Sequence, residues 1–484
     1  MIMLRIALLL VLFGGALLRV QGGERPNILL FITDDESWLE RSAYGWSPLP
    51  TPAFDKVAEQ GALFTNGYTS APSCAPARAS VLAGRNFWEL EQGAFIQAYV
   101  PKTIPVFTHL LHDAGYHVGY TDKGWGPGVV NEDSHDNLFV REYNEIEVEN
   151  QLPDLTPYDY VANFERFLED RKEAQPFFFW AGVTEPHDPM DPKNYLRLEK
   201  EYGLTLDDIP MPPVLEDTRE NRINRANILY EICYADLQLQ KMIDLLEAKG
   251  ELDNTLLIVT SDNGTVVVRD GQLFAKASAY DYGVHIPLAV MWPSRMEAGR
   301  TVTDFVNFRD FAPTFLELAG VEKPQGMSGE SLLPILLSGD SGQIDPERNW
   351  MMTGLEWHGE FDPQSRSSRS IREGRYSLIF RYSNVDEGGK PLPSERLVEP
   401  SSMEFYDLAT DPWEMKNLAD DPKYAVKIRS LSEKMKTYGL QTSDPRFTGE
   451  MDLFVQTRRY VLMRKRIGYE DTFELPFNRA KVPD

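Results

Sequence analysis

Two pairs of oxygen-bearing side chains follow strongly apolar segments of this 484-residue chain. Asp34 and Asp35 come directly after the run 27–33, and Asp262 and Asn263 follow the run 256–260 and one serine. Ligands of open α/β sheets bind beyond the carboxyl ends of the strands, so both pairs are candidate site residues. An all-oxygen set suits a hard cation such as Ca²⁺ or Mg²⁺ and is poorly matched to Zn²⁺. Either pair alone is equally typical of a strand-end turn, but their joint occurrence favours a metal site.

A cysteine lies in the third candidate segment. Pro76 and Gly84 frame a short helix and place Cys74 at its N-terminus, where the helix dipole favours an anion. The small and polar neighbours of Cys74 are not typical of a core, whereas Cys233 lies in an apolar helical segment and is expected to be a packed thiol. Two cysteines allow at most one disulfide, which excludes a disulfide-framework protein.

Composition narrows the class of protein. The chain is 42% hydrophobic and 25% charged, as in ordinary globular proteins. Forty-nine Lys and Arg against 74 Asp and Glu give a net charge of −25, which argues against general binding to nucleic acid.

The N-terminus predicts export. Arg5 precedes an apolar run over 6–18, which is too short to span a bilayer and is typical of a signal peptide over residues 1–23. The alternative is a buried N-terminal helix. No later run approaches membrane length, so we expect an exported protein, periplasmic or secreted, without a membrane span.

Helices and strands are expected to alternate in the first part of the chain. Strands are predicted at 27–33, 118–121, 177–183 and 256–260, and helices at 51–61, 103–114, 157–173 and 225–249, which indicates an α/β fold with a mainly parallel sheet. Gly, Ser, Asp and Pro at 339–346 suggest a linker, and 370–380 resembles a hairpin turning at Glu373 and Gly374. We therefore expect domains at 24–345 and 346–484.

Cys74, Pro76 and Arg78 form a C-x-P-x-R motif that resembles the signature of the formylglycine-dependent type I sulfatases, in which this cysteine is oxidised to an aldehyde after translation. Segments 25–35, 51–55, 261–264 and 403–418 resemble further parts of that family. The resemblance implies an alkaline-phosphatase-like α/β sandwich with a large mainly parallel sheet flanked by helices, plus a smaller C-terminal α+β domain with an antiparallel sheet.

Roles follow from the resemblance, position by position. Cys74, converted to 3-oxoalanine (formylglycine) by a formylglycine-generating or anaerobic sulfatase-maturating enzyme, would be hydrated and place one oxygen on the cation. That cation, Ca²⁺ or alternatively Mg²⁺, would be held by the two oxygen-bearing pairs. A thiol is a poor ligand for a hard cation, whereas a diol oxygen is a good one. The implied catalytic residues are Cys74 as nucleophile, Arg78 beside it, Lys123 and Lys276 on the sulfate, and His187 as proton donor to the leaving oxygen; the implied metal ligands are Asp34, Asp35, Cys74, Asp262 and Asn263.

Two departures from the family pattern bear on the substrate. Trp125 occupies a place that many members fill with histidine, and Thr184 replaces the first histidine of H-x-P-H around His187. Neither departure affects the implied mechanism, but both argue against assigning the substrate of the arylsulfatases to this chain. Trp125 would stack on a sugar ring or simply pack, and His285 would touch substrate or support a neighbouring residue. The predicted substrate contacts are Trp125, His285, His358, Arg366 and Arg369, with plain surface exposure as the alternative for the two arginines.

The sequence thus predicts an exported sulfatase that hydrolyses sulfate esters of a carbohydrate. The pattern is closest to the branch of N-sulfoglucosamine sulfohydrolases, so hydrolysis of an N-sulfate is the first alternative. A phosphate or phosphonate monoesterase is a second, disfavoured because a dianionic phosphate would need more positive charge. A sulfated-glycan binding protein with an unmodified Cys74 and no turnover is the third.

Overall fold

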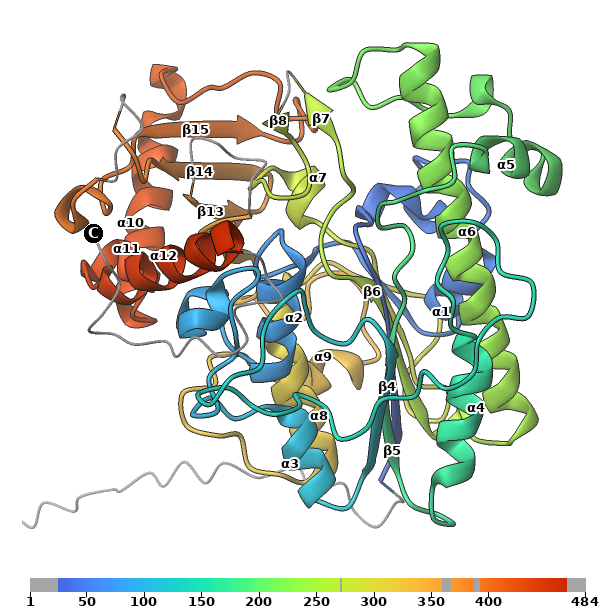
Figure 1. Cartoon of the computed structure of the whole chain (residues 1–484). Helices are drawn as coiled ribbons and strands as arrows, with labels where there is room; N and C mark the ends of the chain where they lie inside the picture. The colour runs from blue at the N-terminus through green and yellow to red at the C-terminus, as the bar shows by residue number, and fades with distance from the viewer. Residues whose placement is uncertain (1–24, 270–271, 359–366, 387–391, 468–484) are drawn as a thin grey trace, which may run out of the picture.

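Strand β1 (Asn27–Thr33) lies inside a seven-stranded sheet in the computed structural model, which describes residues 25–269, 272–358, 367–386 and 392–467 (Figure 1). The predicted signal segment 1–23 lies outside these residues. The strand order is β10-β2-β9-β6-β1-β5-β4, and β9 runs antiparallel to both of its neighbours while the other pairs are parallel. The other strands are β2 (Ala62–Phe64), β4 (His117–Asp122), β5 (Phe177–Gly182), β6 (Thr255–Ser261), β9 (Leu288–Met291) and β10 (Arg300–Val302).

Helices cover both faces of this sheet (Figure 1). All seven residues of β1 are buried, and alternate side chains join two separate cores, with Leu29 and Phe31 in one and Ile28 and Leu30 in the other. The first core includes residues of α1 (Pro52–Gln60), α4 (Tyr160–Asp170) and α6 (Arg219–Ala248), and the second includes residues of α2 (Cys74–Ala83), α3 (Phe107–Asp113) and α8 (Phe311–Ala319). Burial on both faces explains why the strand sequences are continuous apolar runs.

Helix starts differ from the predicted ones where local chemistry decides. The helix expected from 103 begins at Phe107, two residues after Pro105, because proline disfavours the helical conformation of the residue before it. The helix expected from 225 begins at Arg219, and the Thr218 side chain caps it by accepting a hydrogen bond from the Asn221 N–H at 3.2 Å. This earlier start adds almost two turns to α6.

The C-terminal part forms a second, antiparallel sheet in the order β12-β13-β14-β15, packed against α10 (Ala425–Gln441). The α/β fold class and the C-terminal antiparallel sheet are confirmed, including the hairpin; the domain boundary at 345 stays a prediction. The Thr353 hydroxyl donates to the carbonyl oxygens of Ser70 and Thr69 at 2.7 and 3.0 Å. These bonds bring the second sheet to the segment that precedes Cys74. Its strands are β12 (Trp350–Leu355), β13 (Ser367–Glu373), β14 (Tyr376–Tyr382) and β15 (Ser402–Asp407).

A buried ion-pair network joins the second sheet to the short helix α11 (Pro445–Thr448). Glu356 accepts from Arg446 at 2.7 Å and from Arg369 at 2.8 Å, and Arg369 also donates to Asp444 at 2.6 Å. Burial alone would raise the pKa of Glu356, but the two guanidinium groups lower it to about 2. The pKa in the folded protein therefore lies below that of the unfolded chain.

Removing this carboxylate should destabilise the fold. We expect Glu356→Gln to lower the free energy of unfolding at pH 7 by about 3 kcal/mol, because it leaves the buried guanidinium group of Arg446 without its carboxylate partner and removes one of the two partners of Arg369. The unfolded chain binds the Glu356 proton more readily, so the wild-type advantage is present at neutral pH and is lost as the pH falls from 4.5 towards 2. Urea unfolding at pH 7 and pH 3 measures both effects. Glu399→Gln, at an exposed pair with Arg396, is the matched control, and an equal loss there would contradict the argument.

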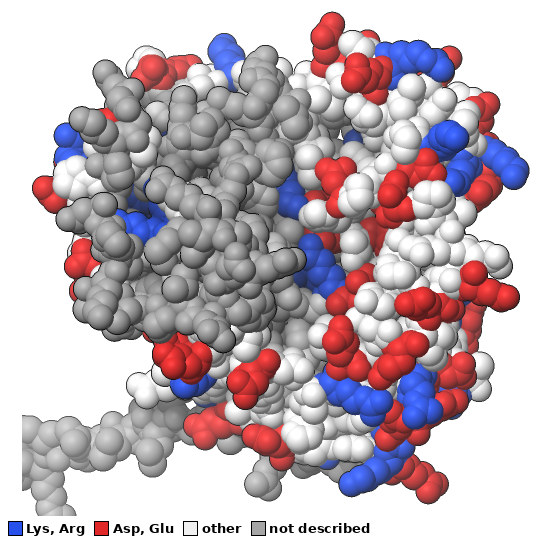
Figure 2. Space-filling model, viewed as in Figure 1, with Lys and Arg blue, Asp and Glu red and all other residues white. Residues whose placement is uncertain are grey.

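Where Figure 2 leaves the described residues visible, acidic side chains are spread over the surface with Lys and Arg between them. Among the described residues, no helix is both long and apolar enough to cross a membrane.

Candidate functional site

The two predicted acidic strand ends meet. Thr33 pairs with Ser261 in the parallel ladder of β1 and β6, so the chain leaves both strands at the same level. Asp35 has a φ of 72°, in the left-handed region, and this turn brings consecutive side chains to one point although they would diverge along a strand. Carboxylate oxygens of Asp34, Asp35 and Asp262 lie within 4.8 Å of one another, and all three residues are buried.

Each of the three carboxylates has one cationic partner. Lys123, directly after β4, contacts Asp34; the ammonium group of Lys276 lies 2.5 Å from Asp35; and Arg78, one helical turn after Cys74, donates from Nε to Asp262 at 2.8 Å. Five separate chain segments thus place six charges together. With one divalent cation added, the cluster would carry two positive charges in excess, which suits an incoming anion.

Burial and charge pairing act in opposite directions on the pKa values of this cluster. Burial alone would raise the pKa of Asp34, but Lys123 and His187 hold it well below its usual range. Burial and the neighbouring Asp34 raise the pKa of Asp262 to about 6, despite Arg78. Burial alone would lower the pKa of Lys276, but Asp35 raises it well above its usual value. The three neighbouring carboxylates therefore still favour the binding of a further cation.

Two oxygen atoms fit a bound cation. Asp34 Oδ1 and Asn263 Oδ1 are buried and have no hydrogen-bond partner among the described residues. The Asn263 amide group donates from Nδ2 to Asp35 at 2.6 Å, so its oxygen is turned away from that bond. A buried oxygen without a partner is costly, and a hard cation would satisfy both atoms. The predicted ligand set is therefore brought together by the fold, and its chemistry suits Ca²⁺ or Mg²⁺.

Cys74 is the first residue of α2, as predicted, and is 1% exposed. Its sulfur lies within 4.8 Å of ligand atoms of Asp34 and His187. Burial raises the pKa of the Cys74 thiol to about 12, so an unmodified side chain is a neutral thiol at pH 7. Cys233 packs in an apolar cluster with Leu229 and Ile232, in agreement with the sequence.

His187 reaches the cluster from the loop after β5. Its Nδ1 lies 2.6 Å from the carbonyl oxygen of Asp188, and its Nε2 lies 3.7 Å from Asp35. Nδ1 therefore carries the proton that it donates to the carbonyl, and Nε2 is the ring nitrogen that faces the cluster. About a third of the side chain is exposed, so this face of the cluster is open to a ligand.

The second sheet contributes one predicted residue to the same place. His358, three residues after β12, shares a 2.8 Å hydrogen bond from Nδ1 with the hydroxyl of Ser73, the residue before Cys74. Burial, with Lys276 and His187, lowers the pKa of His358 to about 3, so its imidazole is neutral at pH 7. A neutral imidazole beside the lysines adds hydrogen-bonding capacity without a further charge.

Other predicted substrate contacts have different surroundings. Trp125 donates from its indole nitrogen to the Ala75 carbonyl at 3.1 Å and packs on the core, which is the packing alternative. Both ring nitrogens of His285 are bonded, to Asp281 and Thr65 at 3.0 Å each, so it can act only by supporting its own segment.

Arg369 is fully buried in the network with Glu356 and Asp444. Its guanidinium group is held by these two carboxylates, which argues against both predictions for it, substrate contact and plain exposure. Arg366 lies outside the described residues.

One supporting residue was not predicted. Glu185 is buried, and its carboxylate accepts from the Thr156 N–H at 2.8 Å and the Tyr160 hydroxyl at 2.7 Å, while its carbonyl oxygen accepts from the Asp34 N–H at 3.3 Å. It thereby fixes the loop that carries His187 against the end of β1. The signal in the sequence that could have indicated a role for Glu185 is its position between an apolar strand and a proline.

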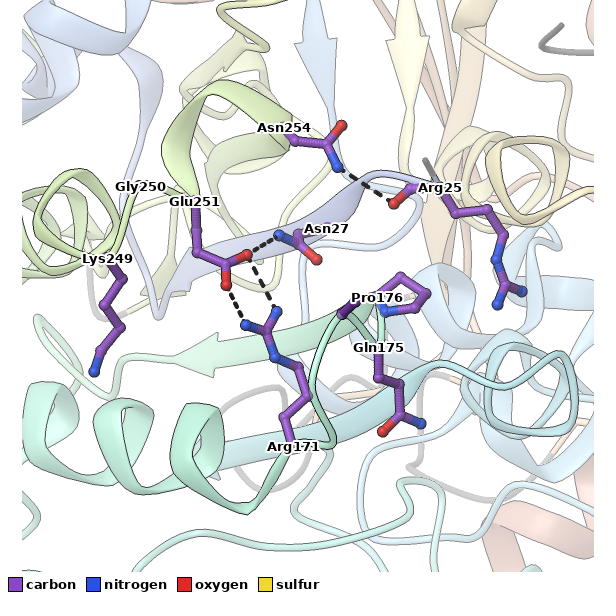
Figure 3. Close-up of a pocket in the computed structure, with 10 residues that line it drawn as sticks. Arg25, Asn27, Arg171, Gln175, Pro176, Lys249, Gly250, Glu251 and Asn254 are labelled. Atoms are coloured by element: carbon purple, nitrogen blue, oxygen red, sulfur yellow. Dashed lines mark hydrogen bonds and ion pairs between the residues drawn. The ribbon is translucent and has the colours of Figure 1, made fainter. Parts of the chain in front are cut away.

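A pocket of about 440 Å³ lies at the opposite end of the sheet (Figure 3). It is bordered by Asn27 at the start of β1 and by Arg171, whose guanidinium group binds Glu251; Asn27 donates to the same carboxylate at 2.7 Å. The described lining includes no cysteine, histidine or aspartate, which are the reactive groups found at the carboxyl ends of the strands.

Comparisons with known proteins agree with this geometry. The Sulfatase family profile matches residues 26–321, more than half of the chain, and the profile described as N-sulphoglucosamine sulphohydrolase, C-terminal, matches residues 270–441. An ulvan-active sulfatase of Formosa agariphila is 27% identical over 435 residues, covering 85% of this chain and 78% of its own. An N-acetylglucosamine-6-O-sulfatase of Bacteroides thetaiotaomicron is 25% identical over 521 residues, covering 87% of both chains.

A solved structure of a protein in complex with its substrate, D-glucosamine-2-N,6-O-disulfate, shares the fold. It superimposes with a TM-score of 0.67 at 21% identity, over 87% of this chain and 98% of its own. The extent of the first profile match decides the family: the chain belongs to the sulfatases, which are sulfuric ester hydrolases.

Proposed function

We propose that this chain is an exported sulfatase that removes sulfate from a carbohydrate, with Cys74 converted to formylglycine and a divalent cation bound by Asp34, Asp35, Asp262 and Asn263. The observation that carries this proposal is the convergence of Cys74 with two buried, unpartnered oxygen atoms and three side-chain cations. The two relatives described above, both named as sulfatases of carbohydrates, support the substrate class. The predicted signal segment supports export.

The chain's own residues account for the steps around the nucleophile. The cation, which Asp34, Asp35, Asp262 and Asn263 would hold, and a formylglycine at Cys74 would supply an activated oxygen nucleophile. Lys123 and Lys276 bind the sulfate oxygens and stabilise the charge that develops on them. His187 donates a proton from Nε2 to the departing alcohol oxygen. Arg78 holds Asp262 and donates to the Lys123 carbonyl at 2.5 Å, so it fixes the lysine loop against the nucleophile helix.

Hydrolysis of an N-sulfate is the second candidate. It is favoured by the match of residues 270–441 to the C-terminal profile of N-sulphoglucosamine sulphohydrolase. The leaving group would then be an amine in place of an alcohol, and the same histidine would protonate it. The two candidates differ in the substrate, and the site described above serves both.

A panel of defined sugars tests the proposal. Sulfate release would be measured from O-sulfated and N-sulfated glucosamine and from O-sulfated galactose, glucuronate and N-acetylgalactosamine, with phosphate and phosphonate monoesters alongside. We expect turnover of at least one O-sulfated sugar. Turnover of the N-sulfate alone would select the second candidate. With Cys74 shown by mass spectrometry to be modified, no turnover of any sulfated sugar would refute both.

Loss of the proton donor should depend on the leaving group. We expect His187→Asn to lower kcat for a sugar sulfate about 10²- to 10⁴-fold, because a sugar alkoxide leaves poorly without a proton. The same variant should lose much less activity on 4-nitrophenyl sulfate, whose phenolate needs no proton to leave. Parallel measurement of kcat on both substrates checks this. Equal losses would show that His187 acts by positioning and not as the acid.

A further inference from the structure

A cavity of about 400 Å³ lies beside the catalytic cluster and is assigned to nothing by the sequence motifs. Its lining includes Asp188, directly after His187, and Thr265, two residues after Asn263. The Asp188 carbonyl accepts from His187 at 2.6 Å, and the Thr265 carbonyl accepts from the Lys276 N–H at 3.1 Å. Two of its lining residues are therefore one hydrogen bond away from catalytic residues, Asp188 from the His187 side chain and Thr265 from the main chain of Lys276.

The opposite wall comes from the first turns of α6, the turns that the sequence analysis missed. Asn221, Asn224 and Ile228 lie three and four residues apart and share one face of this helix, and all three line the cavity. Asn224 is exposed, and no described residue bonds to its amide group. Asn221 donates from Nδ2 to the Glu216 carbonyl at 2.8 Å, and its oxygen has no partner among the described residues. A helix face that usually packs apolar side chains here presents amides to an open space.

The lining mixes hydrogen-bonding and apolar groups. Thr265, Asp188 and the amides supply the polar part, and Met190, Leu215 and Val267 contribute apolar surface. A hexopyranose ring matches such a lining, because its hydroxyl groups project from the rim while its C–H groups form apolar patches. The volume falls within the range of small-molecule sites, about 300 to 1,000 Å³.

Charge narrows the ligand further. Arg225 is the only cation among the described lining residues, and its guanidinium group is buried and bound to Glu40 at 2.7 and 3.1 Å. Asp188 is exposed, and the side chain forms no bond with a described residue. Among its described lining residues the cavity therefore has a carboxylate and no available cation, in contrast to the neighbouring cluster with Lys123 and Lys276. An anionic sugar would be repelled here.

We propose that this cavity is a subsite for an uncharged hexopyranose unit that adjoins the sulfated unit in the substrate. The inference rests on the proposed carbohydrate sulfatase function and adds to it the specificity for the neighbouring sugar. An uncharged neighbour gains hydrogen bonds from Asn221 and Asn224, whereas a uronate or a second sulfated unit faces Asp188. The enzyme should then prefer chains in which charged and neutral units alternate.

Three probes test the subsite: the sulfated monosaccharide turned over fastest in the panel, and the same unit extended by galactose or by glucuronate. With the wild type we expect the galactose extension to lower KM and the glucuronate extension to raise it. Asn224→Ala should raise KM about fivefold for the galactose-extended substrate and leave KM for the monosaccharide unchanged. Gln240→Ala, an amide farther along the same helix, is the matched control and should change neither.

A charge variant supplies an independent measurement. Asn224→Lys should raise kcat/KM for the glucuronate-extended substrate relative to the galactose-extended one, and melting temperatures would confirm that both Asn224 variants are folded. Equal effects of Asn224→Ala on monosaccharide and disaccharide, or a wild-type preference for glucuronate, would overturn the subsite alone. If the wild type released no sulfate from any sugar, the proposed function would fall, and the subsite with it.

Discussion

Cys74→Ala should abolish sulfate release while leaving the fold intact. The side chain is the proposed precursor of the nucleophile, and loss of a nucleophile costs about 10⁴-fold or more in kcat. Alanine keeps most of the buried volume of the cysteine at the start of α2, and the neighbouring ion pairs do not involve the sulfur, so stability should change little. Sulfate release and thermal unfolding of the purified variant measure the two effects separately.

The second cysteine offers a matched control. Cys233→Ala removes a buried thiol of the same size from α6, where the residue packs and donates a hydrogen bond to the Pro50 carbonyl at 3.8 Å. We expect it to keep wild-type kcat within a factor of about two and to lose some stability through the small cavity. If Cys74→Ala retained activity, or if both variants lost it equally, the nucleophile would have to be sought elsewhere in the cluster.

Removal of divalent cations should have the second largest effect, both on activity and on stability. Dialysis against a chelator leaves Asp34 Oδ1 and Asn263 Oδ1 without partners, and we expect turnover to vanish and the melting temperature to fall. A cation that binds only the folded protein stabilises it by about 2.7 kcal/mol at 100 times its Kd. Adding Ca²⁺ or Mg²⁺ should restore both properties, and titration with each shows which cation is preferred.

The stability measurement separates binding from catalysis. Asp34→Asn should lose the cation-dependent rise in melting temperature, because a neutral amide is a weaker ligand than a carboxylate. NaCl at matched ionic strength controls for screening and should give no such rise. A melting temperature that does not respond to divalent cations, in a protein that stays active after chelation, would contradict the assigned site.

Much of the site was predictable because it depends on a general property of parallel sheets. Residues that follow strands meet at one edge, so the positions of Asp34, Asp35 and Asp262 followed from the apolar runs that precede them. Strands β1 and β6 pair directly, although more than 200 residues separate them in the sequence. The family motif supplied what spacing alone could not, namely the choice of Lys123, His187 and Lys276 among many similar residues.

The failures concern partners that lie far away in sequence. Arg369 and Asp444 are 75 residues apart, and nothing local to either residue indicates that they bind each other in the core. His285, for which a supporting role was one of the two predictions, is held between the rings of Trp38 and Tyr68, and the sequence did not indicate these neighbours from distant segments. The sequence does not distinguish an exposed charged residue from a buried one until its partner is known. The surroundings of the charged residues in the second sheet were therefore predicted less well than the site at the first sheet.

The burial of α2 sets an order of events in the life of the protein. All ten residues of this helix are buried, and Cys74 is 1% exposed, so a maturation enzyme has no access to the thiol once the chain has folded. The proposed oxidation of the side chain would therefore have to take place on the nascent or still unfolded polypeptide. Chains that fold first would be trapped as stable but permanently inactive molecules, and the yield of active protein would be decided by a competition between two rates.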